Sequence, residues 1–275
     1  MKSALHFIFF IFYFFAAKAG TADTVSVFSA SMHKSIKAVV IKPDSYKIKT
    51  NRFPVIYLLH GYDGNYSNWI IYAPELKVYA DIYQIIIICP DGAASSWYFD
   101  SPVDITYRYE THIAKEVVNY VDRNFRTIAN KKHRAITGLS MGGHGALFIG
   151  LRHAAVFGAA GSMSGGVDLK ESKNRFDISK RIGDPVLHAA AWHNLTVINL
   201  IEKYANTKLK IIFDCGNKDI FIDGNRRLHQ KMLRLKIPHD YRERPGMHNW
   251  DYWRGSIGNQ LLYFSNFFKK NMVKK

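Results

Sequence analysis

The sequence predicts an α/β fold, in which helices cover both faces of a mostly parallel central sheet and an antiparallel hairpin precedes it. Residues 55–59 and 85–88 are near-continuous apolar runs rich in β-branched side chains, which is typical of strands buried on both faces. Between these runs, and again at 109–125, apolar side chains recur with the period of a helix. Strands and helices that alternate in this way favour a parallel sheet covered on both sides.

The remaining elements follow in chain order. Residues 25–31 and 35–41 are predicted to form the two strands of the hairpin. After the helix at 109–125, four further strands are expected, at residues 134–137, 157–162, 209–214 and 240–244. The stretch 165–182 is polar and begins with two glycines, so we interpret it as an excursion over the edge of the sheet and not as a domain boundary.

Length and composition favour a single domain. The chain has 275 residues, of which 48% are apolar and 14% aromatic, far more than a disordered polymer carries. One α/β domain spanning residues 20–275 fits this size. With only two cysteines, neither a disulfide framework nor a cysteine-based zinc site is expected.

The chain is strongly basic, with 38 Lys and Arg against 22 Asp and Glu and a formal net charge of +16. The basic residues are scattered singly and in pairs, without a run of five or six and without a basic stripe interleaved with aromatic residues. This pattern indicates a solvated basic surface and no nucleic-acid partner. Such a surface attracts acidic polymers at most.

Residues 1–19 have the composition of a secretory signal. Lys2 supplies a positive start, residues 4–17 form a 14-residue apolar stretch dense in Phe, and residues 17–19 supply a small-x-small cleavage site. A helix needs roughly 20 apolar residues to span a bilayer, so no stable membrane insertion is expected. We therefore predict cleavage near Ala19 and a secreted or periplasmic mature protein.

The motif Gly-x-Ser-x-Gly occurs at residues 138–142 and places Ser140 at its centre. The predicted strand 134–137 leads directly into it, and residues 143–149 continue as a helix rich in small side chains. This strand–turn–helix context is the one that a nucleophile elbow requires, because the strained turn exposes the serine oxygen above the sheet. Ser140 is therefore the predicted nucleophile.

A serine nucleophile needs a base, and the edge of the sheet discriminates among the 12 histidines. Active sites in such sheets lie at the carboxyl ends of the strands. His239 opens the predicted strand 240–244 and so lies at the wrong edge, whereas His248 follows the end of that strand. His248 is the predicted base.

The same argument selects the acid that orients the base. Asp214 lies inside the predicted strand 209–214, whereas Asp219 lies beyond its carboxyl end, after a four-residue turn. Asp223 follows four residues later and is the fallback candidate. The chain order Ser140, Asp219, His248 is the one expected for this sheet topology.

An oxyanion hole should use two backbone N–H groups. One belongs to the residue after the nucleophile, Met141, and the other to the Gly-containing loop 60–64 that follows the strand 55–59. The amide of Tyr62 is the best candidate in that loop, because Gly61 lets the backbone turn inward.

Several segments together resemble the esterase D branch of the α/β-hydrolases, which includes feruloyl and acetyl-xylan esterases, S-formylglutathione hydrolase and mycolyltransferases. The resemblance covers about residues 25–268 and implies an α/β-hydrolase fold, a catalytic triad of Ser140, Asp219 and His248, and oxyanion donors at Tyr62 and Met141. The segments that carry it, in the order of the family, are residues 58–64 with Trp69, 96–102, 138–143, 214–219 and 248–253.

The resemblance also suggests that the loop carrying Trp97 and Tyr98 borders the acyl or leaving-group pocket. With His60, these residues form the predicted substrate-binding set; for the two aromatic residues, packing beneath the sheet edge is the alternative. The strand order of the family separates Cys89 from Cys215, so no disulfide is expected between them.

The predicted function is that of a secreted serine carboxylic-ester hydrolase that acts through an acyl-enzyme and needs no metal or organic cofactor. Export favours short-acyl or aryl esters of carbohydrates, such as acetyl or feruloyl groups, including esters linked to a polysaccharide. Alternatives on the same triad are acyl transfer to a sugar acceptor and hydrolysis of S-formylglutathione or a siderophore ester. A binding module without turnover would show a broken triad, and all three members are present here. The oligomeric state stays open.

Overall fold

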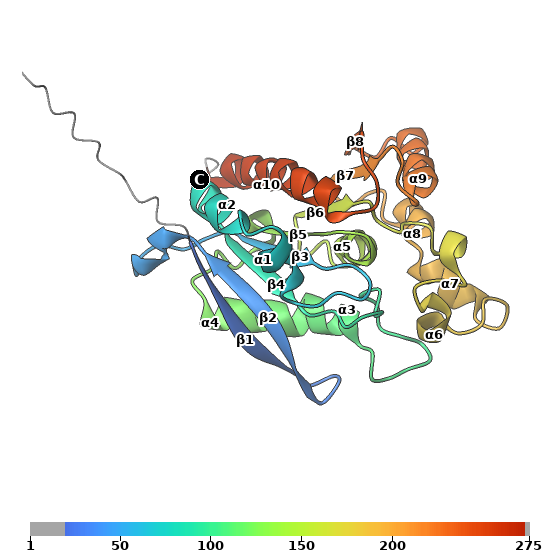
Figure 1. Ribbon diagram of the computed structural model, residues 1–275, viewed down its shortest axis with the longest axis horizontal. Helices are drawn as coiled ribbons and strands as arrows, with labels where there is room; N and C mark the ends of the chain where they lie inside the picture. Colours follow the sequence, from blue (N-terminus) through green and yellow to red (C-terminus); the bar gives the residue numbers. More distant parts are fainter. Residues whose placement is uncertain (1–19, 273–275) are drawn as a thin grey trace, which may run out of the picture.

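The computed structural model describes residues 20–272, which are organised around a sheet of eight strands in the order β1-β2-β4-β3-β5-β6-β7-β8 (Figure 1). The first two pairings, β1 with β2 and β2 with β4, are antiparallel, and the others are parallel. The predicted fold class is therefore confirmed. The predicted signal, residues 1–19, lies outside the described residues. The strands are β1 (Thr21–Ser29), β2 (Lys34–Lys42), β3 (Val55–Leu59), β4 (Ile86–Pro90), β5 (Arg134–Gly138), β6 (Ala159–Met163), β7 (Lys210–Gly216) and β8 (Asp240–Arg244).

The N-terminal hairpin is longer than the sequence predicts. β1 pairs with β2 from Thr21 opposite Lys42 to Ser29 opposite Lys34, so its first strand begins four residues before the predicted position 25. The extra residues are mostly polar and exposed. An edge strand with solvent on its faces needs no apolar alternation, which is why hydrophobic periodicity does not detect this part.

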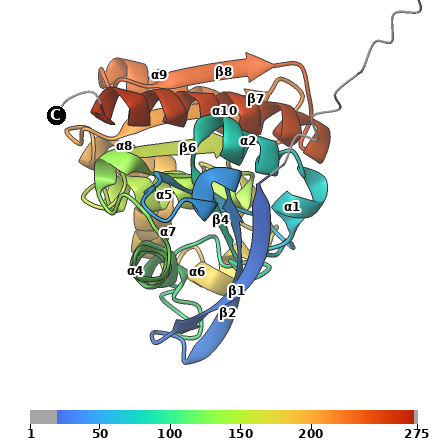
Figure 2. The ribbon, with the colours of Figure 1, turned by 90° about the vertical axis from the view of Figure 1, so that its left-hand side faces the viewer.

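Helices cover both faces of the sheet, and Figures 1 and 2 show α10 and α2 on one face and α4 on the other. The first face carries α1 (Asn68–Tyr72), α2 (Leu76–Tyr83) and α10 (Trp250–Met272). The opposite face carries the continuous helical segment α3 (Tyr109–Thr111), η2 (His112–Val117) and α4 (Val118–Asn124), together with α5 (Met141–Arg152), α8 (Val197–Lys203) and α9 (Ile222–Arg234). The shorter elements are η1 (Asp44–Lys47), η3 (Lys131–His133), η4 (Leu169–Ser172), α6 (Ile178–Ile182) and α7 (Ala189–Leu195).

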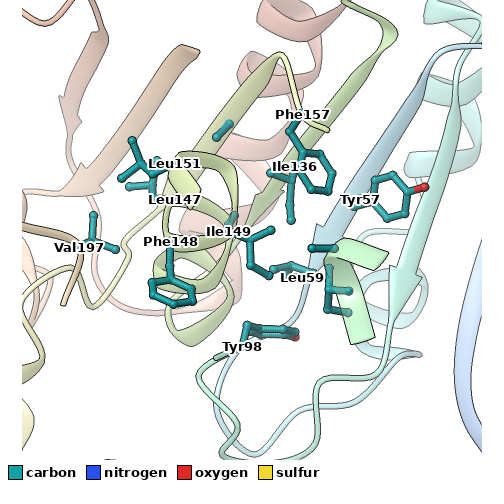
Figure 3. Packing of buried hydrophobic residues seen from close by; sticks show 14 of the residues in the cluster. Tyr57, Leu59, Tyr98, Ile136, Leu147, Phe148, Ile149, Leu151, Phe157 and Val197 are labelled. Atoms are coloured by element: carbon teal, nitrogen blue, oxygen red, sulfur yellow. The ribbon is translucent and has the colours of Figure 1, made fainter. Parts of the chain in front are cut away.

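Alternate residues of the central strands enter two separate cores. In β3, Val55, Tyr57 and Leu59 pack with α5 and its neighbours, whereas Ile56 and Leu58 pack with α1, α2 and α10. Figure 3 shows the first of these cores, with Leu59 near Ile149 of α5 and Tyr57 near Phe157. Because both faces are buried, the strand needs a continuous apolar run, which is the pattern that the sequence shows.

The parallel strands end at one edge of the sheet, and the loops after β3, β5, β7 and β8 meet there. A long insertion between β6 and β7 contains the predicted excursion at 165–182, where η4 and α6 lie. Cys89 and Cys215 are both buried and free in this structure. Among the described helices, none combines the length and the apolar character that crossing a membrane requires.

Candidate active site

Ser140 sits in a strained turn between β5 and α5. Its backbone has φ 54° and ψ −117°, a positive φ that residues other than glycine rarely adopt. The surrounding chain holds this conformation, since the Ser140 N–H donates to the Met163 carbonyl at 2.9 Å and the Ser140 carbonyl accepts from the His144 N–H at 3.0 Å. The strained turn carries the side chain out beyond the end of the sheet, at the start of a helix.

The glycines of the motif are required by close approach of the backbone. A Cβ atom on Gly142 would lie 2.5 Å from the His60 carbonyl oxygen and 2.6 Å from that of Leu59. A Cβ atom on Gly138 would lie 2.6 Å from the Gly142 carbonyl oxygen. No real side chain tolerates these distances, so only glycine lets the start of α5 pass this close to β3.

Hydrogen bonds join Asp219, His248 and Ser140 in a line. His248 Nε2 lies 2.9 Å from Ser140 Oγ, and His248 Nδ1 lies 3.0 and 2.9 Å from the two carboxylate oxygens of Asp219. A carboxylate only accepts hydrogen bonds, so the Nδ1–H donates to Asp219 and the Nε2 lone pair faces the serine hydroxyl. Asp219 is buried, and its Oδ1 also accepts from the Phe221 N–H at 2.9 Å.

The fallback acid Asp223 lies elsewhere. Its side chain is 75% exposed and pairs with Arg226 on the same turn of α9, at 3.8 Å. The geometry therefore favours Asp219, which occupies the loop between β7 and α9.

The backbone amides of Tyr62 and Met141, beside Ser140, have no hydrogen-bond partner within residues 20–272. The next amide along the chain is engaged in each case, since the Asp63 N–H donates to the Ala94 carbonyl at 2.8 Å and the Gly142 N–H donates to the Leu139 carbonyl at 2.7 Å. Backbone N–H groups without partners are uncommon in folded proteins. Here they belong to the two residues that the sequence selects as oxyanion donors.

A pocket of about 310 Å³ opens over Ser140 and His248. Its polar lining includes Asp63 and Asn68, and Phe176 reaches it from the insertion between β6 and β7. The aromatic side chains that line it are Tyr62, Tyr72, Phe176, Trp250 and Trp253.

Phe176 and Tyr72 are absent from the sequence-based prediction. Tyr72 stacks on Trp250, with 4.6 Å between ring centroids, and lines the pocket from α1. Only one signal could have found Phe176: it is a lone aromatic residue in the polar excursion 165–182. Tyr72 carries no local signal, because its approach to Trp250 depends on long-range packing.

The three predicted substrate-binding side chains do not line this pocket. Trp97, Tyr98 and His60 are all 1% exposed or less, and they pack beneath the loops that form it. The Trp97 Nε1–H donates to the Phe176 carbonyl at 3.0 Å, and the Tyr98 hydroxyl donates to the His60 carbonyl at 3.2 Å. We therefore revise their predicted role from direct contact with substrate to support of the pocket loops, in line with the packing alternative.

The His60 ring bridges two loops at the base of the pocket. Its Nδ1 lies 2.8 Å from the Gly61 carbonyl oxygen, and its Nε2 lies 2.8 Å from the Gly92 N–H. Burial lowers the pKa of His60, which favours the neutral ring. The neutral tautomer with the proton on Nδ1 satisfies both contacts, because Nδ1–H then donates and Nε2 accepts. The loop that carries the Tyr62 amide is fixed in this way.

Comparison with known proteins agrees with this architecture. A sequence model of the family described as "Putative esterase" matches residues 29–264. The chain belongs to this family. Among curated members of similar sequence, an esterase of Mycobacterium tuberculosis is 27% identical over 235 residues, and an acetyl esterase of Caldicellulosiruptor saccharolyticus is 26% identical over 262 residues. The match to the mycobacterial protein covers 76% of this chain and 51% of that protein, so the chain spans about half of its length. The match to the acetyl esterase covers 88% of this chain and 97% of that enzyme.

Solved structures related to this chain share its fold. A ferulic acid esterase superposes with a TM-score of 0.78 at 27% identity, covering 91% of this chain and 99% of its own. An S-formylglutathione hydrolase from Agrobacterium tumefaciens superposes with a TM-score of 0.79 at 18% identity, covering 92% of this chain and 97% of its own. The second likeness shows a common fold alone. In the described part of this family member, no three His, Cys, Asp or Glu side chains are grouped so that they could hold a metal ion.

Proposed function

We propose that this chain is a serine carboxylic-ester hydrolase that works through an acyl-enzyme on Ser140. The observation that carries the proposal is the hydrogen-bonded line from Asp219 through His248 to Ser140, with 2.9 Å between His248 Nε2 and Ser140 Oγ. The family match and the name of the ferulic acid esterase support the same reaction class. Serine, histidine and aspartate in this geometry activate a hydroxyl for attack on an acyl carbon.

Acylation begins when His248 Nε2 takes the proton of the Ser140 hydroxyl as its oxygen bonds to the ester carbonyl carbon. The carbonyl oxygen becomes an oxyanion, and the N–H groups of Tyr62 and Met141 donate to it. The bond from that carbon to the alcohol oxygen then breaks, and the alcohol leaves with the proton from Nε2. The acyl group stays on Ser140, and Asp219 holds the imidazolium in place throughout.

Deacylation repeats these steps with water. His248 takes a proton from a water molecule, whose oxygen attacks the acyl carbon, and returns it to Ser140 as the bond to the enzyme breaks. The acid product and the free serine result. None of these steps calls on a metal or an organic cofactor.

For substrates, we propose short-acyl or aryl esters of carbohydrates, with acetyl and feruloyl groups as the first candidates. The aromatic lining of the pocket suits a flat acyl group or a sugar ring, and two similar proteins are named acetyl esterase and ferulic acid esterase. The predicted signal segment supports the further proposal that the enzyme acts outside the cytoplasm, where such esters on polysaccharides are met.

The test compares purified wild type with Ser140→Ala on p-nitrophenyl acetate and butyrate, and by labelling with a fluorophosphonate. We expect Ser140→Ala to lose turnover and labelling, while Ser26→Ala, at an exposed position of β1, keeps both. Turnover retained by Ser140→Ala would contradict the proposal. A panel of acetylated xylan and methyl ferulate, compared by kcat/KM with and without added sugar acceptors, then distinguishes the acyl group and separates hydrolysis from transfer.

A further inference from the structure

A second buried carboxylate lies behind the candidate site and has no part in the mechanism above. Asp214 belongs to β7, five residues before Asp219, and is 3% exposed. A carboxylate buried in a core is unfavourable unless donors surround it. Asp214 has four such donors, and three of them come from one helix.

The three donors lie on α10 at intervals of four residues, which places them on one face of the helix. The Tyr252 hydroxyl donates to Asp214 Oδ1 at 2.9 Å, and the Ser256 hydroxyl donates to the same oxygen at 2.5 Å. The Gln260 side-chain amide donates to Asp214 Oδ2 at 2.8 Å. Arg244, at the end of β8, supplies the fourth donor, with its Nη2 at 3.4 Å from Oδ1.

Gln260 extends the network across the sheet. Its side chain is fully buried, and its Nε2 also donates to the Ser162 carbonyl of β6 at 2.9 Å. Its Oε1 accepts a hydrogen bond from the Thr137 hydroxyl of β5. The chain of contacts therefore runs from β5 through α10 to β7 and touches β6 on the way.

Three residues of this network lie within five residues, along the chain, of a member of the proposed triad. Thr137 precedes Ser140 by three residues, Asp214 precedes Asp219 by five, and Tyr252 follows His248 by four. Tyr252 also packs against the loop before His248, because a Cβ atom on Gly246 would lie 2.4 Å from its ring.

Apolar packing alone would hold α10 against the sheet, because Ile257, Leu261 and Phe264 all lie in the core. Apolar burial is non-directional, so it leaves the rotation and axial shift of a helix weakly defined. Hydrogen bonds to one fixed carboxylate define both. His248 lies two residues before α10 begins, so an axial shift of this helix moves its imidazole relative to Ser140.

We propose that Thr137, Gln260, Asp214 and Tyr252 form a positioning network that holds the His248 segment in register with Ser140 and Asp219. This inference rests on the proposed function, because its readout is the reactivity of Ser140. The four residues are positioning residues and do not contact the substrate.

The test is Tyr252→Phe, which removes one hydroxyl and keeps the ring against Gly246. We expect kcat on p-nitrophenyl butyrate to fall about tenfold with KM unchanged, because a small misplacement of a base acts on the chemical step. The rate constant of labelling by a fluorophosphonate should fall by a similar factor. Both are measured well below the unfolding temperature, so that all of the protein is folded.

The matched control is Tyr263→Phe. Tyr263 also lies on α10 and donates to a carbonyl of β7, that of Ile211 at 3.3 Å, near the beginning of the strand and far from the site. We expect this variant to keep the kcat and the labelling rate of wild type, whatever its unfolding temperature.

Wild-type kcat and labelling in Tyr252→Phe would overturn the proposal. An equal loss of kcat in both tyrosine variants would also overturn it, since general weakening of α10 would then explain the effect. Asp214→Asn, if it folds, should likewise lower kcat and leave KM unchanged. A changed KM with a normal kcat in this variant would contradict the network. The proposed function itself fails only if Ser140→Ala keeps activity, so the two failures are distinguishable.

Discussion

The indole of Trp253 and the imidazole of His248 meet almost at right angles, with 4.9 Å between ring centroids and 89° between the ring planes. Phe221 makes a similar contact with His248, at 5.1 Å and 81°. Trp253 lies on α10, five residues after His248, and Phe221 directly precedes α9, two residues after Asp219. They restrict rotation of the imidazole, so its Nε2 stays directed at Ser140.

From this contact we expect Trp253→Leu to lower kcat about tenfold, because the imidazole gains room to turn away from Ser140. Trp253→Phe keeps an aromatic ring at this position and should retain most of the activity. Since the Trp253 Nε1 has no hydrogen-bond partner among the described residues, this second variant breaks no polar contact. Steady-state kinetics on p-nitrophenyl butyrate measures both, and an unchanged kcat in Trp253→Leu would show that the ring does not hold His248.

A second prediction separates the two candidate acids. Asp219→Asn should lower kcat by a factor on the order of 10⁴, because the amide can turn its NH₂ toward His248 and favour the wrong tautomer of the ring. Asp223→Asn makes the same chemical change on an exposed side chain and should leave kcat within about twofold of wild type. Comparable losses in the two variants would contradict the assignment of Asp219.

The candidate site was largely predictable because parallel strands impose a simple rule. Once the strands at 134–137, 209–214 and 240–244 are recognised, residues just beyond their carboxyl ends must meet at one edge of the sheet. That rule places Ser140, Asp219 and His248 together without any knowledge of side-chain packing. The structure brings these three residues within hydrogen-bond distance.

What the sequence left out depends on contacts between distant segments. Asp214 was predicted as an ordinary strand residue, because nothing local shows that Gln260, 46 residues later, donates to it. Trp97 was assigned to the pocket because the family resemblance suggests that its loop borders the site. Its indole in fact packs beneath the edge of the sheet, against Phe176 and His144. Periodicity identifies which elements form, but it does not tell which of two nearby aromatic rings faces the solvent.

A third prediction concerns two glycines in helices. Gly142→Ala should prevent normal folding or lower stability by several kcal/mol, on the order of other severe backbone clashes, because its Cβ would meet the carbonyl oxygens of Leu59 and His60. Gly255→Ala, inside α10, should raise the free energy of unfolding by about 1 kcal/mol, because its Cβ would meet no atom within 4 Å and alanine favours the helix. Urea unfolding of the two variants beside wild type checks the contrast. A Gly142→Ala protein as stable as wild type would show that the start of α5 can move away from β3.

The last prediction is that the protein loses stability between about pH 6.5 and pH 4 because of buried histidines. His144 is fully buried on α5, and burial lowers its pKa to about 4. Its ring nitrogens lie 3.1 Å from the Trp97 carbonyl oxygen and 2.9 Å from that of Leu195. A second proton would let both nitrogens donate, but the desolvation of the charged ring outweighs this gain.

The sign follows from comparing the two states of the chain. Below about pH 6.5 the unfolded chain binds a proton on this histidine, while the folded protein stays neutral until about pH 4. The free energy of unfolding therefore falls as the pH falls through this window, by about 3 kcal/mol from His144 alone. Burial lowers the pKa of His60, His112, His133 and His229 as well, which adds in the same direction. Urea unfolding at pH 7, 6 and 5 should show a steady loss, and His144→Gln, which cannot titrate, should show a smaller one. A wild-type free energy of unfolding that is constant or rises from pH 7 to pH 5 would contradict the argument.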